Sequence, residues 1–275
     1  MPDLNLSVTT DGPVEFYRTV LKTLHRSEVP FLIGGTFAME TLAGISRPTK
    51  DLDLFLLRKD WPAACRALRE VGIDCRMVYA HWLGKATRGD FFVDLIFASG
   101  NGVARVDDTW LTHASVSTVL DVPVRVCPPE EMIWSKSFVM ERERFDGADV
   151  LHILRHSGRQ LNWQRLVARF GTHGEVLLAH LVLFAYVYPG LRDIVPAWVM
   201  DELWNRRDTP DGTPSQECRG TLLSRTQYLV DVDAWGASDA RLGPRGTMSQ
   251  DDVAAWTAEI EPATIPLPAP SLSCR

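Results

Sequence analysis

The sequence predicts an α+β (α/β) fold, with a mixed β-sheet flanked by helices and followed by a mainly helical C-terminal portion. Short runs rich in strand-forming residues alternate with amphipathic segments between residues 13 and 126. From Pro128 onwards the pattern changes to longer helical segments. The 275 residues are enough to bury a substantial core. We expect three parts: 1–127, which contains the sheet; 128–206, which is helical; and 207–275, a C-terminal extension with a proline-rich tail.

The elements of the first part are expected where apolar residues recur with a helical or strand period and where Gly or Pro ends the run. The expected helices cover 13–26, 36–43 and 61–71, and the expected strands cover 31–33, 49–57, 74–80, 91–98, 115–120 and 122–126. Asp60 is expected to cap the third helix, because Trp61-Pro62 follows it directly. A basic turn around Lys85 and Arg88 is expected between the strands on either side of it.

The helices of the second part have recognisable starts. Pro128-Pro129-Glu130-Glu131 places acidic residues at the positive end of a helix dipole. Asp146 is expected to cap the next helix, with Asp149 as its capping partner. Further helices are expected over 161–170, 175–188 and 195–206, a short apolar element near residue 222, a helix from residue 249, and an extended or disordered tail from about residue 260.

Composition excludes several classes of protein. The net charge of −6 is unfavourable for a protein that coats nucleic acid. The five cysteines form no CxxC or Cys/His cluster, so neither a zinc site nor a disulfide framework is expected. No signal peptide is recognisable, and no run approaches the roughly 20 apolar residues of a membrane helix. The longest apolar run, 176–187, is expected to be a buried helix, and we expect a cytoplasmic protein without a membrane partner.

A pair of acidic residues in an apolar run is the strongest chemical signal. Residues two apart on a strand point to the same face, so Asp51 and Asp53 are expected side by side while Leu52 and Leu54 face the core. Adjacent carboxylates repel each other, and burying them unpaired is costly. Oxygen-only ligands favour Mg²⁺ or Mn²⁺, so a divalent cation between them is expected. The alternative is a pair of solvated residues on an edge strand.

A third acid and a glycine pair accompany the first two. Asp94 lies in the middle of the strand-like run 91–97, where it is either a third metal ligand or a salt-bridged acid on the sheet. Gly34 and Gly35 end the apolar run 31–33 and precede a helix, which permits close approach of a phosphate to helix N-terminal amides. Thr36 is expected to cap that helix, to donate its hydroxyl to a phosphate, or both.

The order of these motifs resembles the nucleotidyltransferase superfamily that includes DNA polymerase β. Within it, GGTFAMETLAGISRPTKDLDLF is most similar to AbiE-type abortive-infection toxins and related minimal nucleotidyltransferases, and the resemblance covers roughly residues 28–157. It implies a nucleotidyltransferase-like fold in which Asp51, Asp53 and Asp94 bridge Mg²⁺ or Mn²⁺ and an NTP. The resemblance extends to Arg47 and Thr49, which match the Arg and Ser/Thr that precede the acidic pair in these toxins.

A second segment, KSFVMERERFDGADV, matches the same family. The resemblance implies that Lys136 contacts nucleotide phosphates and that Asp146 orients a base or substrate group. Arg144 matches the family arginine, although Phe145 separates it from the first acid. The alternative is a helix cap with a solvated face of charged residues. Arg47 and Lys50, which flank the acidic pair, are expected either over the triphosphate or paired with local acids.

These observations predict a metal-dependent transferase that moves an NMP from an NTP to an acceptor hydroxyl. The acceptor is expected to be RNA, such as a tRNA end, or a protein, with a toxin-like role and an antitoxin-like partner as the family resemblance implies. A small-molecule nucleotidyltransferase of the aminoglycoside or lincosamide type is the first alternative. A non-catalytic binding protein of the same fold is the second.

Overall fold

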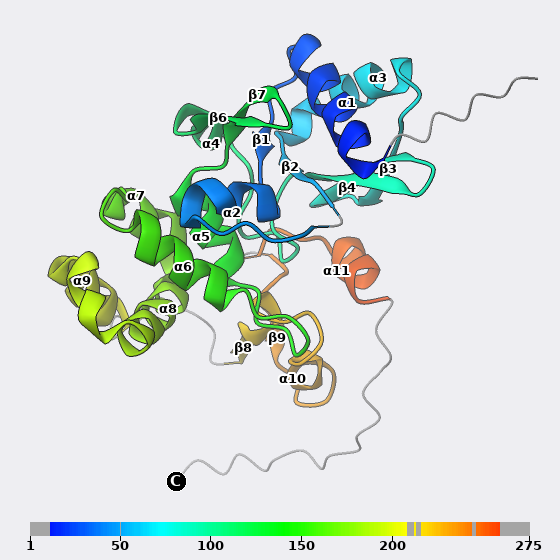
Figure 1. Cartoon of the computed structure of the whole chain (residues 1–275). Coiled ribbons are helices and arrows are strands. Elements are labelled where there is room, and N and C mark those ends of the chain that lie inside the picture. The colour runs from blue at the N-terminus through cyan, green and yellow to red at the C-terminus, as the bar shows by residue number, and fades with distance from the viewer. Residues whose placement is uncertain (1–11, 50, 208–211, 213–215, 244–245, 259–275) are drawn as a thin grey trace, which may run out of the picture.

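The computed structural model describes residues 12–49, 51–207, 212, 216–243 and 246–258. A seven-stranded mixed sheet forms its centre, with the strand order β3-β4-β5-β2-β1-β7-β6 (Figure 1). The strands are β1 Leu32–Ile33, β2 Asp53–Phe55, β3 Asp74–Tyr79, β4 Leu83–Arg88, β5 Phe91–Ile96, β6 Ser115–Val119 and β7 Val122–Val126. Strand β2 runs parallel to β5, and β1 runs parallel to β7, while the other neighbours in this sheet are antiparallel.

Helices surround the sheet and then continue as a separate layer, so the predicted fold class is confirmed (Figure 1). The helices are α1 Pro13–Arg26, α2 Gly35–Ala43, α3 Trp61–Glu70, α4 Asp108–Thr112, α5 Pro129–Ser137, α6 Gly147–Ser157, α7 Trp163–Phe170, α8 Gly174–Val187, α9 Ala197–Arg207, α10 Leu229–Asp233 and α11 Gln250–Thr257. A small parallel pair, β8 Glu217–Cys218 and β9 Ser238–Asp239, lies in the C-terminal segment. The division into three domains stays a prediction.

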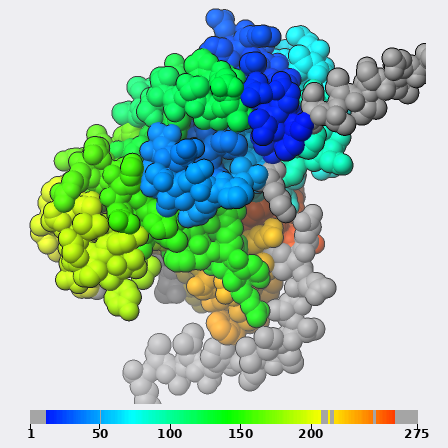
Figure 2. Space-filling view, viewed as in Figure 1, coloured from blue at the N-terminus to red at the C-terminus, as the bar shows by residue number. Residues whose placement is uncertain are grey.

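The C-terminal segment packs against the first two parts of the chain. In Figure 2 its orange surface adjoins the green surface that precedes α6. The amide of Met140 donates to the carbonyl of Leu223 at 3.0 Å, and the side chain of Asn101 donates to the carbonyl of Leu222 at 2.6 Å. Thr247 donates to the carbonyl of Gly102 at 2.8 Å. Residues 216–243 and 246–258 therefore form part of the same packed structure as the sheet.

Strand alternation separates the core from the face that carries the acids. Leu52, Leu54 and Leu95 are fully buried, as the apolar pattern predicts. Asp53 and Asp94 are Cα partners on the parallel strands β2 and β5, so they stand side by side on the opposite face. The core thus fixes the position of both acids, because a shift of one residue in either strand would bury a carboxylate in place of a leucine.

The sequence-based expectation of a basic turn at Lys85 and Arg88 is wrong. Residues 83–88 form strand β4, which pairs with β3 on one side and β5 on the other. Gly and Lys are weak strand formers, and tertiary pairing overrides that preference here. Gly84 is required by packing, because a Cβ atom there would lie 2.3 Å from the Trp61 ring.

The structure differs from the sequence-based expectations at two helix caps, at one strand and at one helix. Asp60 and Asp146 occupy N-cap positions, but neither side chain makes a capping hydrogen bond. Strand β2 covers only Asp53–Phe55, so Asp51 precedes the strand. Helix α4 was not expected, and the side chain of Asp107 caps it by accepting from the amide of Thr109. The helix expected from residue 249 is present as α11, with a capping box between Ser249 and Asp252.

One helical run in the described part of the chain, Trp163–Val187, is long and apolar enough to cross a membrane by length and composition alone. In the structure it consists of α7, a 3₁₀ turn and α8, with Gly171 at φ 49° between them. Leu166, Leu177 and Phe184 of this run are fully buried in the core. The run therefore supplies core helices, and the cytoplasmic location stays a prediction.

A buried ionic cluster joins α5 to α7 and α4. The carboxylate of Glu131 is fully buried and accepts from Arg169 at 2.9 Å and from Arg165. Arg165 also donates to Glu130, and Arg169 donates to Asp107 at 2.7 Å. Burial raises the pKa of Glu131, and the two guanidinium groups offset part of that rise. The second and first parts of the chain are thereby linked by charges that are costly to leave unpaired.

Glu131→Ala should lower the free energy of unfolding by about 3 kcal/mol, because it leaves two guanidinium groups with too few buried partners. Glu202→Ala is the control, since Glu202 makes an exposed pair with Arg206 on α9. That change should cost less than about 0.5 kcal/mol. Urea unfolding of both variants measures the difference, and equal losses would contradict this account of the cluster.

Candidate active site

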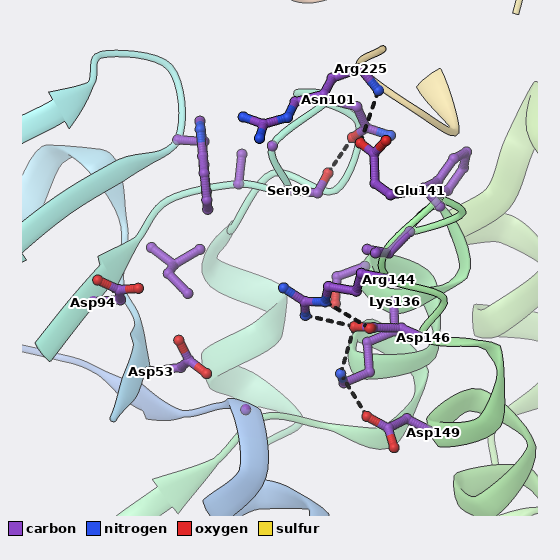
Figure 3. Close-up of a pocket in the computed structure, with 18 of the residues that line it drawn as sticks. Asp53, Asp94, Ser99, Asn101, Lys136, Glu141, Arg144, Asp146, Asp149 and Arg225 are labelled. Atoms are coloured by element: carbon purple, nitrogen blue, oxygen red, sulfur yellow. Dashed lines mark hydrogen bonds and ion pairs between the residues drawn. The ribbon is translucent and has the colours of Figure 1, made fainter. Parts of the chain in front are cut away.

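A cavity of about 890 Å³ opens where the sheet, the α5–α6 region and the C-terminal segment meet. Figure 3 shows Asp53 and Asp94 on one wall and Lys136, Arg144 and Asp146 on the wall opposite. A third wall comes from the loop after β5 and from residues 221–226. The cavity therefore has an acidic side, a mixed basic side and a side that sequence reasoning did not anticipate.

Three carboxylates meet on the acidic side. Asp51, Asp53 and Asp94 each offer an oxygen, and these oxygens all lie within 4.8 Å of one another. Asp51 is outside the strand, but its Oδ1 accepts a hydrogen bond of 2.7 Å from Thr49, which holds it toward the other two. The expectation that the three acids converge is thus met in the structure, while their role as metal ligands stays a prediction.

The electrostatics of this group suit a divalent cation. Burial, with the neighbouring charges of Asp51 and Asp94, raises the pKa of Asp53 from 3.8 to about 6. Burial also raises the pKa of Asp94, and the ammonium of Lys85 offsets part of that effect. A set of oxygen donors that repel one another matches what Mg²⁺ and Mn²⁺ bind in proteins. The residues present therefore fit such an ion.

The glycine pair places the first turn of α2 against the acids. A Cβ atom on Gly35 would lie 1.8 Å from Oδ2 of Asp53, and Gly35 adopts a positive φ of 51°. The amides of Gly35 and Thr36 belong to the first helical turn, where amides have no intrahelical acceptor. Gly34 differs, because its amide donates to the carbonyl of Asp53 at 2.9 Å and a Cβ there would meet the Phe55 ring. Gly35 and Thr36 line the cavity, whereas Gly34 shapes the turn behind them.

The opposite wall is a network of paired charges. Lys136 contacts Asp146 and Asp149, each at 2.9 Å, and Arg144 donates to both oxygens of Asp146 at 2.8 Å (Figure 3). Arg47 contacts Asp149 at 2.8 Å. Burial alone would raise the pKa of Asp146, but the hydrogen bond from Arg144 and the charge of Lys136 hold it below its usual value. In this network Asp146 positions two cations in place of capping α6.

Arg144 is the most exposed cation of this network. Its side chain is 67% exposed, compared with 12% for Lys136. Phe145, which separates Arg144 from Asp146 in sequence, does not prevent the bidentate contact between them. Figure 3 shows the guanidinium of Arg144 directed toward the wall that carries Asp53. Lys50, the remaining residue expected here, lies outside the described residues.

Several residues that line the cavity or lie beside its acidic wall were not anticipated from sequence. Lys85 contacts Asp94 with a separation of 2.6 Å between Nζ and Oδ1. Arg225 lies over the ring of Trp256 at 4.9 Å from its centroid, and its amide donates to Glu141 at 2.9 Å. Each pair except Lys85–Asp94 joins distant parts of the chain, so no local pattern could have identified it. The segment 83–88 gives no clear strand signal for Lys85 either, because its apolar residues Leu83 and Ala86 lie three apart.

The comparisons with known proteins concern the fold. No family model matches the chain, and no curated protein matches it. The chain is similar to the antibiotic-resistance factor ANT(2'')-Ia, with 16% identity over 66% of this chain and 95% of that one and a TM-score of 0.40. It is similar to the lincosamide antibiotic adenylyltransferase LnuA, with 13% identity over 52% and 96% and a TM-score of 0.36.

A third similar structure is an antigenic nucleotidyltransferase-like protein from Paracoccidioides brasiliensis, with 16% identity over 67% of this chain and 92% of that one and a TM-score of 0.41. Two of these three descriptions name an adenylyltransferase or a nucleotidyltransferase-like protein. At such identities and TM-scores the similarity carries no argument about function, and nothing in it distinguishes the AbiE type.

Gly35→Ala should abolish binding of a divalent cation, because its Cβ would displace the carboxylate of Asp53. Gly72→Ala is the matched control, since Gly72 has a φ of 74° and nothing within 4 Å of an added Cβ. Both variants should lose about 1 kcal/mol of stability from strain. Mn²⁺ binding, followed by electron paramagnetic resonance, should be lost in Gly35→Ala alone. Unchanged binding in Gly35→Ala would contradict the proposed contact.

Asp53→Asn should stabilise the metal-free protein at pH 8. The usual pKa of 3.8 applies to the unfolded chain and a value of about 6 to the folded one. Between these values the unfolded chain loses its proton first, so stability falls as pH rises through this window and then levels off. At about 1.4 kcal/mol per pKa unit, Asp53 destabilises the fold by up to about 3 kcal/mol above pH 6.

Urea unfolding in EDTA at pH 8 and at a pH well below 3.8 measures this effect. The gain in stability should be present at pH 8 and absent in acid, where the carboxyl is protonated in both states. Asp90→Asn, at an exposed turn position, should be neutral at both pH values. A stability of Asp53→Asn below that of the unmodified protein at pH 8 would contradict the repulsion inferred here.

Proposed function

We propose that the chain is a divalent-metal-dependent nucleotidyltransferase, which moves an NMP from an NTP to an acceptor hydroxyl. The observation that carries the proposal is the convergence of Asp51, Asp53 and Asp94 within 4.8 Å, facing a wall of held cations across one cavity. Neither the acidic cluster nor the wall of cations would support this function alone, because acidic clusters are common on protein surfaces. Their combination matches what a triphosphate with its metal ions requires.

On the acidic side, Asp51, Asp53 and Asp94 would hold Mg²⁺ or Mn²⁺. Such an ion supplies charge neutralisation and polarises phosphoryl oxygens. Lys85 occupies Oδ1 of Asp94, which leaves Oδ2 as the oxygen available to an ion or to a proton from the acceptor hydroxyl. Thr49 holds Asp51 in place through its hydroxyl. No covalent intermediate is needed, so the proposal assigns no nucleophilic Ser or Cys.

Gly35 and Thr36, beside the acids, would bind the triphosphate together with Arg47, Lys136 and Arg144 on the opposite side. Amides at a helix N-terminus and guanidinium groups are the donors that phosphates prefer. Arg144 is the best placed of the cations, because it is the most exposed and is fixed by a bidentate contact. Lys136 is enclosed between two carboxylates, so its contribution to phosphate binding is mainly through its charge.

The proposal also includes the chemical class of the acceptor. The AbiE-type resemblance favours a hydroxyl of RNA, a tRNA end or a protein, together with a toxin-like role and an antitoxin-like partner. The cavity favours a small molecule as a second candidate, because residues 221–226 and Trp256 enclose one side of it. Its volume of about 890 Å³ lies within the range of small-molecule sites.

Transfer activity should be lost in Asp51→Asn and in Asp53→Asn, by at least about a hundredfold, because charge stabilisation at the phosphate would be removed. The assay combines the purified chain, each α-labelled NTP, Mg²⁺ or Mn²⁺, total RNA and a metabolite extract. Asp90→Asn is the control, as an exposed acid close in sequence that does not line the cavity. The class of molecule that becomes labelled identifies the acceptor.

Near-normal transfer by Asp51→Asn would refute the assigned metal site. Absence of both transfer and Mg²⁺-dependent NTP binding in the unmodified chain would refute the enzymatic role and leave a non-catalytic binding protein. Retained NTP binding without transfer would direct the search to other acceptors. Circular dichroism of each variant separates these outcomes from a failure to fold.

A further inference from the structure

Lys85 is held in one place by two different contacts. It is the Cα partner of Asp94 across the antiparallel pair β4–β5, and its Nζ lies 2.6 Å from Oδ1 of Asp94. The same Nζ lies 3.9 Å from the centroid of the Phe92 ring. The side chain is 28% exposed. A lysine fixed between a carboxylate and an aromatic face, and largely removed from water, has lost the mobility of an ordinary surface lysine.

The position of this ammonium matters because of the charges around it. Among the described residues, Lys85 is the cation in direct ion-pair contact with one of the three clustered carboxylates. Lys136 and Arg144 are bound to Asp146 on the other wall of the cavity. Lys85 therefore offsets part of the repulsion among Asp51, Asp53 and Asp94 when no divalent cation is bound.

The same contact sets Lys85 in competition with a bound cation. An ammonium at one oxygen of Asp94 removes that oxygen from the ligand set and places a positive charge beside the ion. A purely structural cross-strand pair would instead contribute to stability regardless of metal. Removal of Lys85 should therefore tighten metal binding if Lys85 competes with the cation. It should leave metal binding unchanged if the pair is purely structural.

We propose that Lys85 is a counter-ion built into the carboxylate cluster, which takes one oxygen of Asp94 and weakens divalent-cation binding to the nucleotide-free protein. Cation binding then becomes strongest when a bound triphosphate adds further anionic ligands, so that loading of the metal is coupled to loading of the nucleotide. The inference rests on the metal site of the proposed function. It adds Lys85 as a positioning residue, which acts on that site through Asp94.

The test is Mn²⁺ binding to the nucleotide-free chain at pH 8, followed by electron paramagnetic resonance. Lys85→Met and Lys85→Gln should bind Mn²⁺ at least about tenfold more tightly than the unmodified chain, because a positive charge beside the ion is removed. Lys85→Gln removes the positive charge but keeps a hydrogen-bond donor for Asp94. It therefore separates the effect of charge on Mn²⁺ binding from that of hydrogen bonding. Lys85→Arg keeps the charge and should stay within about twofold of the unmodified chain.

Lys59→Met is the control for net charge, since Lys59 is exposed and pairs with Asp108 outside the cavity. A second readout is thermal unfolding in EDTA and in Mn²⁺. Mn²⁺ should raise the midpoint of Lys85→Met more than that of the unmodified chain. A structural role would lower the midpoint equally in both conditions.

Equal or weaker Mn²⁺ binding by Lys85→Met, with binding still lost in Asp53→Asn, would overturn the role of Lys85 and leave the proposed function intact. Absence of Mn²⁺ binding in the unmodified chain and in every variant would overturn the metal site itself, and with it both proposals. Tighter binding in Lys59→Met to the same extent would show a general charge effect and would also overturn the role of Lys85.

Discussion

Repulsion among three carboxylates is the constraint on which the rest of the cavity depends. The register of β2 with β5 sets Asp53 opposite Asp94, and the apolar residues on either side of them cannot be exposed to relieve the repulsion. Thr49 adds Asp51 to the same small volume. The fold thus stabilises, through its core, an arrangement of charge that is unfavourable by itself. A positively charged ligand would relieve this repulsion.

The other walls of the cavity complement this charge. Arg144 and Lys136 are held by Asp146, so the basic side is preorganised and close to electrically balanced before any ligand binds. A triphosphate with its metal ions would bridge the two sides, since it carries both signs of charge. The C-terminal segment adds a wall of different chemistry, in which Arg225 lies on the ring of Trp256. That wall is distant from the acids in sequence but lines the same cavity.

The sequence predicted the features that local patterns control. Alternation of Leu52, Asp53 and Leu54 was enough to predict which side chains are buried, and the glycine pair was enough to predict a close approach at the start of α2. Strand β4 was missed because the segment around Lys85 and Arg88 was expected to be a basic turn. In the structure Gly84 packs against the Trp61 ring and Lys85 contacts Asp94, and tertiary structure supplies both partners.

The same reason explains the errors at Asp146 and in the C-terminal segment. Asp146 stands where a helix cap is expected, but Lys136 and Arg144 are stronger partners than backbone amides because they carry full charges. Arg225 and Trp256 reach the cavity through contacts with residues far away in the chain, and neither belongs to a recognisable motif. Local sequence therefore predicts residues of the acidic and basic walls of the cavity, and it misses the third wall.

The most direct test of the central claim is a crystal structure of the chain with Mn²⁺ and a non-hydrolysable NTP, with data collected at the manganese absorption edge. The account predicts an anomalous peak bonded to oxygens of Asp51, Asp53 and Asp94, with the triphosphate extending toward Gly35 and Arg144. A peak elsewhere, or a nucleotide bound without manganese at these carboxylates, would contradict it.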